Sequence, residues 1–277
     1  MAMTAKRRRA LVEESILRLG EVDFASLARE FSVSEMTIRR DVDALEVRGI
    51  VRRVTGGVIA LARKVAEPPF QARVAEASEE KGHIAEAVVA MLSAGETVVL
   101  DSGSTVLAVA RAIRGRGLGL TVITPSVLAA VELGDEPDTT VILTGGTLRP
   151  GDLSLVGHDA ADTFKRYNAD TFVMGVAGVH PDRGFSDYHR GESAVKDAAM
   201  QASDRVIVAI DRSKLGRSTL VNIAPTTSVD VIVCDAAEND ATVRKIRQLG
   251  VTVTCVPGGA MRPAQATDDT LVKEPSS

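Results

Sequence analysis

The sequence predicts a multidomain protein, in which a small helical domain with a β-hairpin precedes a larger α/β domain with a mainly parallel sheet. Residues 35–48 have the apolar spacing of an amphipathic helix, between another helical pattern and two short strands joined by glycines. From residue 80 onward, short apolar strands alternate with helical patterns, which is typical of βαβ units. The length of 277 residues exceeds one typical domain, and therefore favours two.

Two helical patterns open the first domain. An apolar stripe of Val12, Ile16 and Leu19 predicts a helix over residues 5–19. Asp23 precedes a second, shorter apolar face and is expected to cap that helix. The first helix is expected to brace the two helices that follow it.

The third helix is bracketed by its own signals. Ser34 can cap it by accepting a hydrogen bond from the Thr37 amide, and Gly49 is placed to end it. The spacing puts Arg40 and Thr37 opposite the apolar stripe, where they can meet base edges if the helix enters a major groove, with Arg39 on the flank near phosphates. Alone, the pattern also fits a solvated amphipathic helix with incidental arginines. The buried stripe consists of Ile38, Val42 and Leu45.

A basic β-hairpin is expected directly after the third helix. Residues 50–54 and 58–59 read as two short strands, and the glycines between them allow the positive φ of a tight turn. Arg52 and Arg53 lie on the first strand. Helix, turn, helix and basic hairpin together predict a winged helix-turn-helix that binds double-stranded DNA.

The stretch from Val33 to Gly57 resembles the N-terminal domain of the DeoR family of bacterial transcriptional regulators. It matches the family signature VSxxTIRRDxxxLExxGxxxRxxGG, and Val42 stands where the family more often has leucine. The resemblance implies operator binding. Because a single helix-turn-helix reads too few bases for specific binding, we expect the large C-terminal domain to hold the chain in a homodimer or homotetramer. No membrane partner is expected. The residues expected to contact operator DNA are Ser34, Thr37, Arg39, Arg40, Arg52 and Arg53.

Charge and composition agree with a local DNA-binding surface. Residues 1–60 hold 11 Lys and Arg against 9 Asp and Glu, whereas the whole chain carries a net charge of −4. Cys234 and Cys255 are isolated in apolar runs, which indicates core residues or free thiols. No apolar run reaches about 18 residues and no hydrophobic leader opens the chain, so a cytoplasmic protein is expected.

The domain boundaries follow from composition. We expect the DNA-binding domain in residues 1–61, a linker in 62–79 around Pro68 and Pro69, the α/β domain in 80–260 and a disordered tail in 261–277. Helices are expected over residues 80–93, 105–113, 127–133, 160–167, 191–203 and 239–249. Strands are expected over residues 97–100, 120–124, 140–143, 171–174, 205–210, 229–234 and 251–255.

Ligand-binding residues should follow the strands, because open α/β sheets bind ligands beyond the carboxyl ends of their strands. The loop Asp101–Thr105 offers a glycine, three hydroxyls and a helix N-terminus, which together can hold a phosphate. Gly145, Gly146 and Lys214 follow other strands. An ordinary helix cap and a solvated lysine are the simpler alternatives.

From about Lys81 to about Asp235 the chain is similar to the C-terminal sensor domain of the DeoR family, which is related to the ribose-phosphate isomerase and CoA-transferase fold. The family's LDSGTT, GG, ExxxK and DxSK motifs recur here, with Ser104 replacing a threonine, and Pro125 stands where an asparagine is usual. The resemblance implies a phosphorylated sugar as effector. Its expected site is formed by Asp101, Ser102, Gly103, Ser104, Thr105, Gly145, Gly146, Glu192 and Lys214.

These patterns predict a repressor of a carbohydrate operon that a phosphorylated sugar releases from DNA, without a cofactor. The alternative is a sugar-phosphate isomerase fused to a DNA-binding domain. Isomerisation needs a carboxylate base, for which Glu192 and Asp187 are the candidates. Residues 176–179 correspond best to the isomerases' DGAD segment and contain no aspartate, so a regulator without catalysis is expected. The four histidines lack the spacing of a zinc site.

Overall fold

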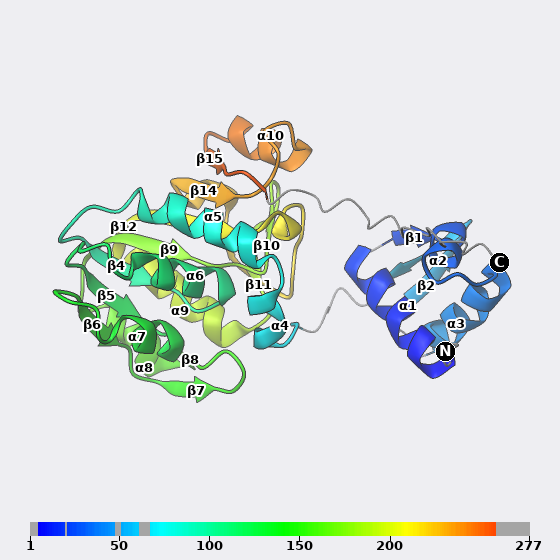
Figure 1. Ribbon diagram of the computed structural model, residues 1–277, viewed down its shortest axis with the longest axis horizontal. Helices are drawn as coiled ribbons and strands as arrows, with labels where there is room; N and C mark the ends of the chain where they lie inside the picture. Colours follow the sequence, from blue (N-terminus) through cyan, green and yellow to red (C-terminus); the bar gives the residue numbers. More distant parts are fainter. Residues whose placement is uncertain (1–4, 20, 48–50, 61–66, 259–277) are drawn as a thin grey trace, which may run out of the picture.

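The computed structural model describes residues 5–19, 21–47, 51–60 and 67–258, which form two domains (Figure 1). In the first domain, three helices pack on a small antiparallel sheet whose strand order is β1-β3-β2. The end expected for the third helix at Gly49, and the tail 261–277, lie outside the described residues. The elements are α1 (Ala5–Leu19), β1 (Glu21–Asp23), α2 (Phe24–Glu30), α3 (Glu35–Val47), β2 (Val51–Val54) and β3 (Gly57–Ala60).

The core of the first domain is the one that the apolar spacing predicts. Ile38, Val42 and Leu45 are completely buried, and so are Val12 and Ile16 of α1. The Asp23 carboxylate accepts a hydrogen bond from the Ser26 amide at 2.8 Å, which confirms the cap of α2. The Ser34 hydroxyl accepts one from the Thr37 amide at 3.2 Å, which confirms the start of α3. β1 was not predicted, because three residues are too few to reveal a periodicity.

A parallel sheet of seven strands forms the centre of the second domain. Its order is β15-β14-β12-β9-β4-β5-β6, and all six neighbouring pairs are parallel. The mainly parallel α/β fold is thus confirmed. The strands are β4 (Thr97–Leu100), β5 (Thr121–Thr124), β6 (Thr140–Leu143), β9 (Ala169–Met174), β12 (Ser203–Ile210), β14 (Val231–Cys234) and β15 (Thr252–Cys255).

Helices cover both faces of this sheet, which explains why its strands are almost continuously apolar. Val98, Leu100 and Val173 belong to the cluster shared with α5, α6 and α7, whereas Val99 and Phe172 belong to the cluster shared with α8, α9 and α10. Successive residues of a strand therefore pack on opposite layers. The helices are α5 (Ser78–Val89), α6 (Ser104–Ile113), α7 (Val127–Leu133), α8 (His158–Phe164), α9 (Arg190–Gln201) and α10 (Ala241–Gln248).

Several short elements were absent from the prediction. A hairpin and a three-stranded antiparallel sheet interrupt the βαβ alternation, with β10-β11-β13 as the order of the latter. Each has strands of only three or four residues, in which alternation is hard to detect. They are β7 (Thr147–Arg149) with β8 (Ser154–Val156), and β10 (Gly178–His180), β11 (Gly184–Asp187) and β13 (Val221–Ala224), besides the 3-10 turns η1 (Arg212–Lys214) and η2 (Thr226–Ser228).

The expected linker differs most from the structure. Residues 67–79 contain α4 (Phe70–Ala75) and the start of α5, and the Phe70 side chain is only 5% exposed. Pro68 and Pro69 do interrupt helical structure, as expected, but the chain folds against the second domain directly after them. Among the described helices, none combines the length and apolar composition needed to cross a membrane.

Candidate functional site

The residues predicted to contact DNA lie on α3 and on the hairpin β2–β3. Arg40 is exposed, on the side of α3 opposite the buried stripe. The Arg39 guanidinium lies 4.3 Å from the centroid of the Phe24 ring and pairs with Glu35 at 3.4 Å, which holds it on the flank of the helix. The Thr37 and Ser34 hydroxyls share a hydrogen bond of 2.9 Å. This geometry fits the predicted roles without testing them.

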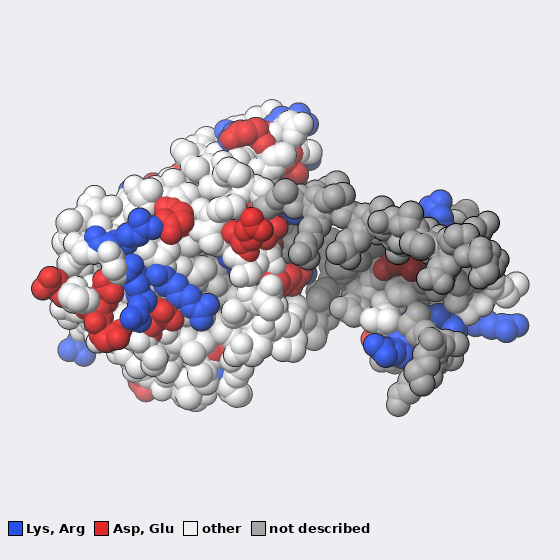
Figure 2. Space-filling view, in the orientation of Figure 1, with Lys and Arg blue, Asp and Glu red and all other residues white. Residues whose placement is uncertain are grey.

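Two further arginines, Arg52 and Arg53, lie on the hairpin. Arg52 and Arg53 are both exposed, and Arg53 also pairs with Asp43 at 2.8 Å and with Glu46 at 3.3 Å, so that it ties the hairpin to α3. Arg8 similarly pairs with the buried Asp41 at 2.7 Å and ties α1 to α3. On the face of the second domain drawn in Figure 2, basic and acidic side chains lie side by side.

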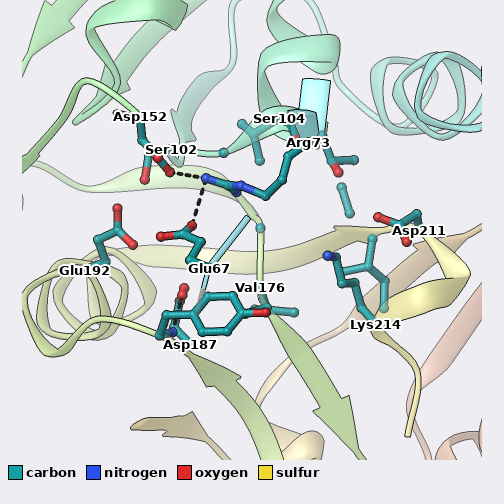
Figure 3. A pocket seen from close by; sticks show the side chains of 18 of the residues that line it. Glu67, Arg73, Ser102, Ser104, Asp152, Val176, Asp187, Glu192, Asp211 and Lys214 are labelled. Carbon is teal, nitrogen blue, oxygen red and sulfur yellow. Dashed lines mark hydrogen bonds and ion pairs between the residues drawn. The ribbon is translucent and has the colours of Figure 1, made fainter. Parts of the chain in front are cut away.

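A polar cavity opens at the carboxyl ends of the central strands β4, β9 and β12 (Figure 3). Ser102, Gly103, Ser104 and Thr105 line it where β4 runs into the N-terminus of α6. Gly103 has a φ of +122° and open space where a side chain would begin, so the cavity reaches the helix terminus. The unpaired amides there favour an anion, as the loop sequence predicts.

Lys214 supplies a cation to the same cavity from the turn after β12. Burial lowers the pKa of its ammonium group, against the opposing attraction of Asp211. Within the part of the chain that the structure describes, this ammonium group makes no hydrogen bond or ion pair. A partly buried cation that lines the same cavity as a helix N-terminus is well placed to receive a negatively charged group.

Asp101 lies behind this loop and does not line the cavity, contrary to the expectation that it contacts the effector. Its carboxylate accepts hydrogen bonds from the amides of Ser102 and Gly175 and from the Lys196 ammonium at 2.5 Å. Burial raises the pKa of Asp101 to about 6. Burial alone would lower the pKa of Lys196, but the Asp101 carboxylate and its acidic neighbours outweigh it and raise that pKa. Asp101 therefore positions Lys196, which does line the cavity.

Carboxylates gather at the other end of the cavity, and Arg73 lies between them and Lys214 (Figure 3). The Arg73 guanidinium of α4 pairs with Glu67 at 2.8 Å and also with Asp152, in the turn of the β7–β8 hairpin (Figure 3). Glu192 accepts hydrogen bonds from Arg149 at 3.1 Å and from the Ser154 hydroxyl at 2.8 Å. Sequence reasoning missed Glu67 and Asp152. The single available signal was the charged stretch around Pro68 and Pro69, which was assigned to a linker.

Gly145 and Gly146, which the sequence places in the effector site, are not among the residues that line this cavity. They follow β6, the edge strand of the sheet, whereas the cavity opens over β4, β9 and β12. Gly146 has a φ of +115°, and an added Cβ would lie 2.7 Å from the Val156 carbonyl oxygen and 2.9 Å from the Cβ of Ala160 in α8. This glycine therefore permits close packing between the loop and α8.

Pro125 contributes to the same supporting structure. Its carbonyl oxygen accepts a hydrogen bond of 2.8 Å from the Leu155 amide, which attaches β8 to the end of β5. Pro125 lies outside the cavity lining. The asparagine that the family more often has at this position is thus replaced by a residue that keeps a backbone acceptor.

The candidate catalytic carboxylates are both held by basic groups. Glu192 is bound by Arg149 and Ser154, and Asp187 lies 3.4 Å from the Lys196 ammonium. Val176 and Ala177, from the segment that contains no aspartate, line the cavity beside them. Cys234 and Cys255 are free and neighbour each other on β14 and β15. Over the described ranges, no three His, Cys, Asp or Glu side chains are placed to share a metal ion.

Comparison with protein families gives matches to both domains. Residues 7–64 match the model of the DeoR-like helix-turn-helix domain, and residues 76–236 match that of the DeoR C-terminal sensor domain. The second match begins within α4–α5, next to the cavity.

Similar proteins and structures were found as well. The regulator GolR of Listeria innocua is 30% identical over 84% of this chain and 91% of its own. The glycerol-3-phosphate regulon repressor of Escherichia coli is 31% identical over 84% and 92%. Among solved structures, ribose 5-phosphate isomerase A of Methanocaldococcus jannaschii aligns over 50% of this chain and 54% of its own, with 16% identity and a TM-score of 0.36.

Proposed function

The chain belongs to the DeoR family of DNA-binding transcriptional regulators, and we propose that it represses a carbohydrate operon until a phosphorylated sugar binds in the cavity. Relatives at about the same distance include the glycerol-3-phosphate regulon repressor and a putative aga operon transcriptional repressor of Escherichia coli. Repression of a catabolic operon is therefore the mode of action that the relatives support.

One observation carries the choice of effector: the N-terminus of α6 and the Lys214 ammonium group line the same cavity. The amides of Ser104 and Thr105 stand in the first turn of α6, where helical carbonyls do not reach them, so they can donate to phosphate oxygens. Lys214 adds a full charge that a phosphate would bind by a charge-assisted hydrogen bond.

The other end of the cavity suits the sugar. Asp152 and Glu192 face it and keep lone pairs beyond those used by the arginines, so they can accept hydrogen bonds from hydroxyl groups. A ligand with phosphate at one end and hydroxyl groups at the other satisfies both ends. An unphosphorylated sugar would leave the Lys214 end without an anion.

Binding without catalysis is the reading that the geometry supports. A general base needs a carboxylate free to take a proton from the substrate, whereas Glu192 and Asp187 are both engaged by cationic side chains. Apolar Val176 and Ala177 occupy the neighbouring wall. We therefore treat the cavity as a sensor, and turnover of a sugar phosphate by the purified protein would contradict this.

A homodimer or homotetramer is part of the same proposal. One winged helix-turn-helix reads too few base pairs for specific binding, so two copies must be held about one DNA turn apart. The α/β domain is the larger of the two and is available for this contact. Light scattering at micromolar concentration, with and without DNA, measures the assembly, and a monomer in both conditions contradicts it.

The deciding experiment measures release of DNA by sugar phosphates. Full-length protein is bound to the DNA upstream of its own gene, and phosphorylated sugars are titrated in parallel with their unphosphorylated forms. Lys214→Ala should raise the concentration needed for release by about 10- to 100-fold, the loss expected for one hydrogen bond to a charged group. Thr105→Val should act in the same direction. Release of both variants at the wild-type concentration excludes this cavity as the effector site.

A further inference from the structure

Glu67 stands directly before Pro68, Pro69 and α4, at the side of the α/β domain nearest in sequence to the DNA-binding domain. Its side chain is only 12% exposed and is held by three groups of the α/β domain. It pairs with Arg73 at 2.8 Å and with Arg149 at 3.1 Å, and it lies 2.9 Å from the His189 ring nitrogen. The point at which the chain enters the α/β domain is thus fixed by one carboxylate.

Arg73 holds this entry point and faces the cavity at the same time. Its Nε donates to the Pro68 carbonyl oxygen at 3.2 Å, and its terminal nitrogen binds the carboxylates of Glu67 and Asp152. The same guanidinium lines the cavity, and its positive charge adds to the burial that lowers the pKa of Lys214, so both cations can face one anion (Figure 3). A ligand bound to Arg73 would compete directly with the groups that fix residues 67–69.

The segment from residue 67 to residue 81 is held by different contacts at its two ends. At its far end, the buried Lys81 ammonium donates to the backbone carbonyl oxygens of Arg73 and Glu76, and Phe70 is packed into the domain. At its near end, the fixing contacts come from Arg73, Arg149 and His189. Pro68 and Pro69 restrict the backbone between the two ends, so movement of Glu67 is passed along the chain.

The charge balance determines which contact an anion would break. Two arginines, Arg73 and Arg149, pair with three carboxylates, those of Glu67, Asp152 and Glu192, so these five groups carry one negative charge in excess. A phosphate on Arg73 brings up to two further negative charges into this group. Asp152 and Glu192 belong to the β7–β8 turn and to α9, inside the domain, whereas Glu67 stands where the chain enters it. Glu67 is therefore the carboxylate that can leave.

We propose that Arg73 is a ligand-binding residue that exchanges the Glu67 carboxylate for the phosphate of the effector, and thereby releases residues 67–69 from the α/β domain. This coupling rests on the proposed sugar-phosphate site and adds the step by which its occupation reaches the DNA-binding domain. Release of this segment changes how the two domains are held relative to each other, which is what a ligand must do to alter DNA affinity.

Reciprocity gives the proposal a measurable consequence. If phosphate weakens the hold on Glu67, then loss of the Glu67 charge must strengthen phosphate binding by the same coupling. A purely structural Glu67 predicts the opposite, since its loss would loosen the cavity wall. Glu76→Gln is the matched control, because Glu76 lines the same cavity but makes no hydrogen bond or ion pair with Arg73 in the described structure.

The first test measures binding of inorganic phosphate to the full-length protein by calorimetry. Glu67→Gln should bind phosphate at least about fivefold more tightly than wild type, and Glu76→Gln should show a smaller gain. Arg149→Gln also loosens Glu67 without lining the cavity, and should tighten binding if Glu67→Gln does not fold. Unchanged or weaker binding in Glu67→Gln, or an equal gain in Glu76→Gln, overturns the proposal.

The second test follows amide hydrogen exchange of the wild-type protein with and without inorganic phosphate. The Arg73 amide, bonded to the Pro69 carbonyl, should exchange faster, while the Leu107 amide of the first turn of α6 should exchange more slowly. Protection of α6 without faster exchange at Arg73 keeps the phosphate site and overturns the coupling. No protection at α6 overturns the phosphate site itself, and the coupling with it.

Discussion

The two domains place their cationic side chains in opposite environments. On α3, the Arg39 side chain is 41% exposed and pairs loosely with an exposed glutamate. In the cavity, Lys196 is 3% exposed and Arg73 is 14% exposed, and each is held by two carboxylates. Both sets of cations are suited to bind phosphate. Those on α3 are exposed to solvent, whereas those in the cavity are held in place by protein carboxylates before a ligand binds.

The difference reflects the two kinds of anion. Operator DNA is long, so each arginine can contact a hydrated phosphate and contribute a little, mainly through released counterions. A sugar phosphate offers a single anionic group, and a few buried groups of fixed orientation must supply all of the binding energy. Exposed arginines therefore suit the first domain, and cations fixed by carboxylates suit the second.

The largest difference between the DNA-binding surface and the cavity should be in how strongly their affinities depend on salt concentration. Raising the salt concentration from 50 to 200 mM should lower operator affinity by about a thousandfold or more if the oligomer contacts six to ten phosphates. Phosphate binding in the cavity should change by less than about tenfold, because buried charges are screened less. Anisotropy of labelled DNA and calorimetry with inorganic phosphate measure the two effects. An equal salt dependence would mean that the cavity is as solvated as the DNA-binding surface.

The second largest difference should be in the free energy of unfolding that is lost when a cation is removed from each domain. Lys196→Met leaves the Asp101 carboxylate buried without its cation, and should lower the free energy of unfolding by about 3–5 kcal/mol. Arg39→Ala breaks an exposed pair with Glu35, and should cost less than about 1 kcal/mol. Urea denaturation, followed separately for each domain, measures both changes. Similar losses in the two variants would contradict the contrast in environment.

A smaller effect is expected within α3. Arg40→Ala should lower operator affinity by about 1–3 kcal/mol per half-site and relax specificity there, since the exposed Arg40 is placed to read a base edge. Arg39→Ala should weaken binding to all sequences alike. Competition between operator and random DNA distinguishes the two patterns, and wild-type selectivity in Arg40→Ala would show that α3 is oriented differently in the groove.

The smallest effect concerns pH. Burial lowers the pKa of Lys214, so its ammonium charge is lost at a lower pH than in an ordinary lysine, whose pKa is about 10.4. Phosphate affinity should therefore fall as pH rises toward that value, by less than about tenfold between pH 7 and 9. Lys214→Arg should remove this decline, because arginine stays protonated. A decline that persists in Lys214→Arg has another origin.

Much of the fold was predictable because its signals are local. The stripe of α3, the caps at Asp23 and Ser34, and the apolar strands of the sheet all depend on residues close in sequence. The parallel topology then predicts that loops after the strands meet at one edge, which brings Ser102–Thr105 and Lys214 together.

The acidic end of the cavity was not predictable in this way. Arg73 and Asp152 are 79 residues apart, and Glu67 and Arg149 are 82 apart. Their meeting depends on α4 and the β7–β8 hairpin, elements too short to show a period. The sequence also does not reveal the order of the strands in the sheet. For this reason Gly145 and Gly146, which follow β6, are predicted to join a site that is formed partly by β9, although β5 and β4 lie between these two strands.

Because β9 lies between β4 and β12 in the sheet, it also determines the order in which parts of the chain can fold during synthesis. The winged helix is complete once residue 60 has emerged, and its contacts are local, so we expect it to fold first. The edge of β4 that pairs with β9 stays unpaired until β9 has been synthesised, 74 residues later. At the speed of the ribosome, this takes about 4–15 s. For that interval a nascent chain carries a folded DNA-binding domain and an uncovered strand, an opportunity for chaperones and a hazard for aggregation.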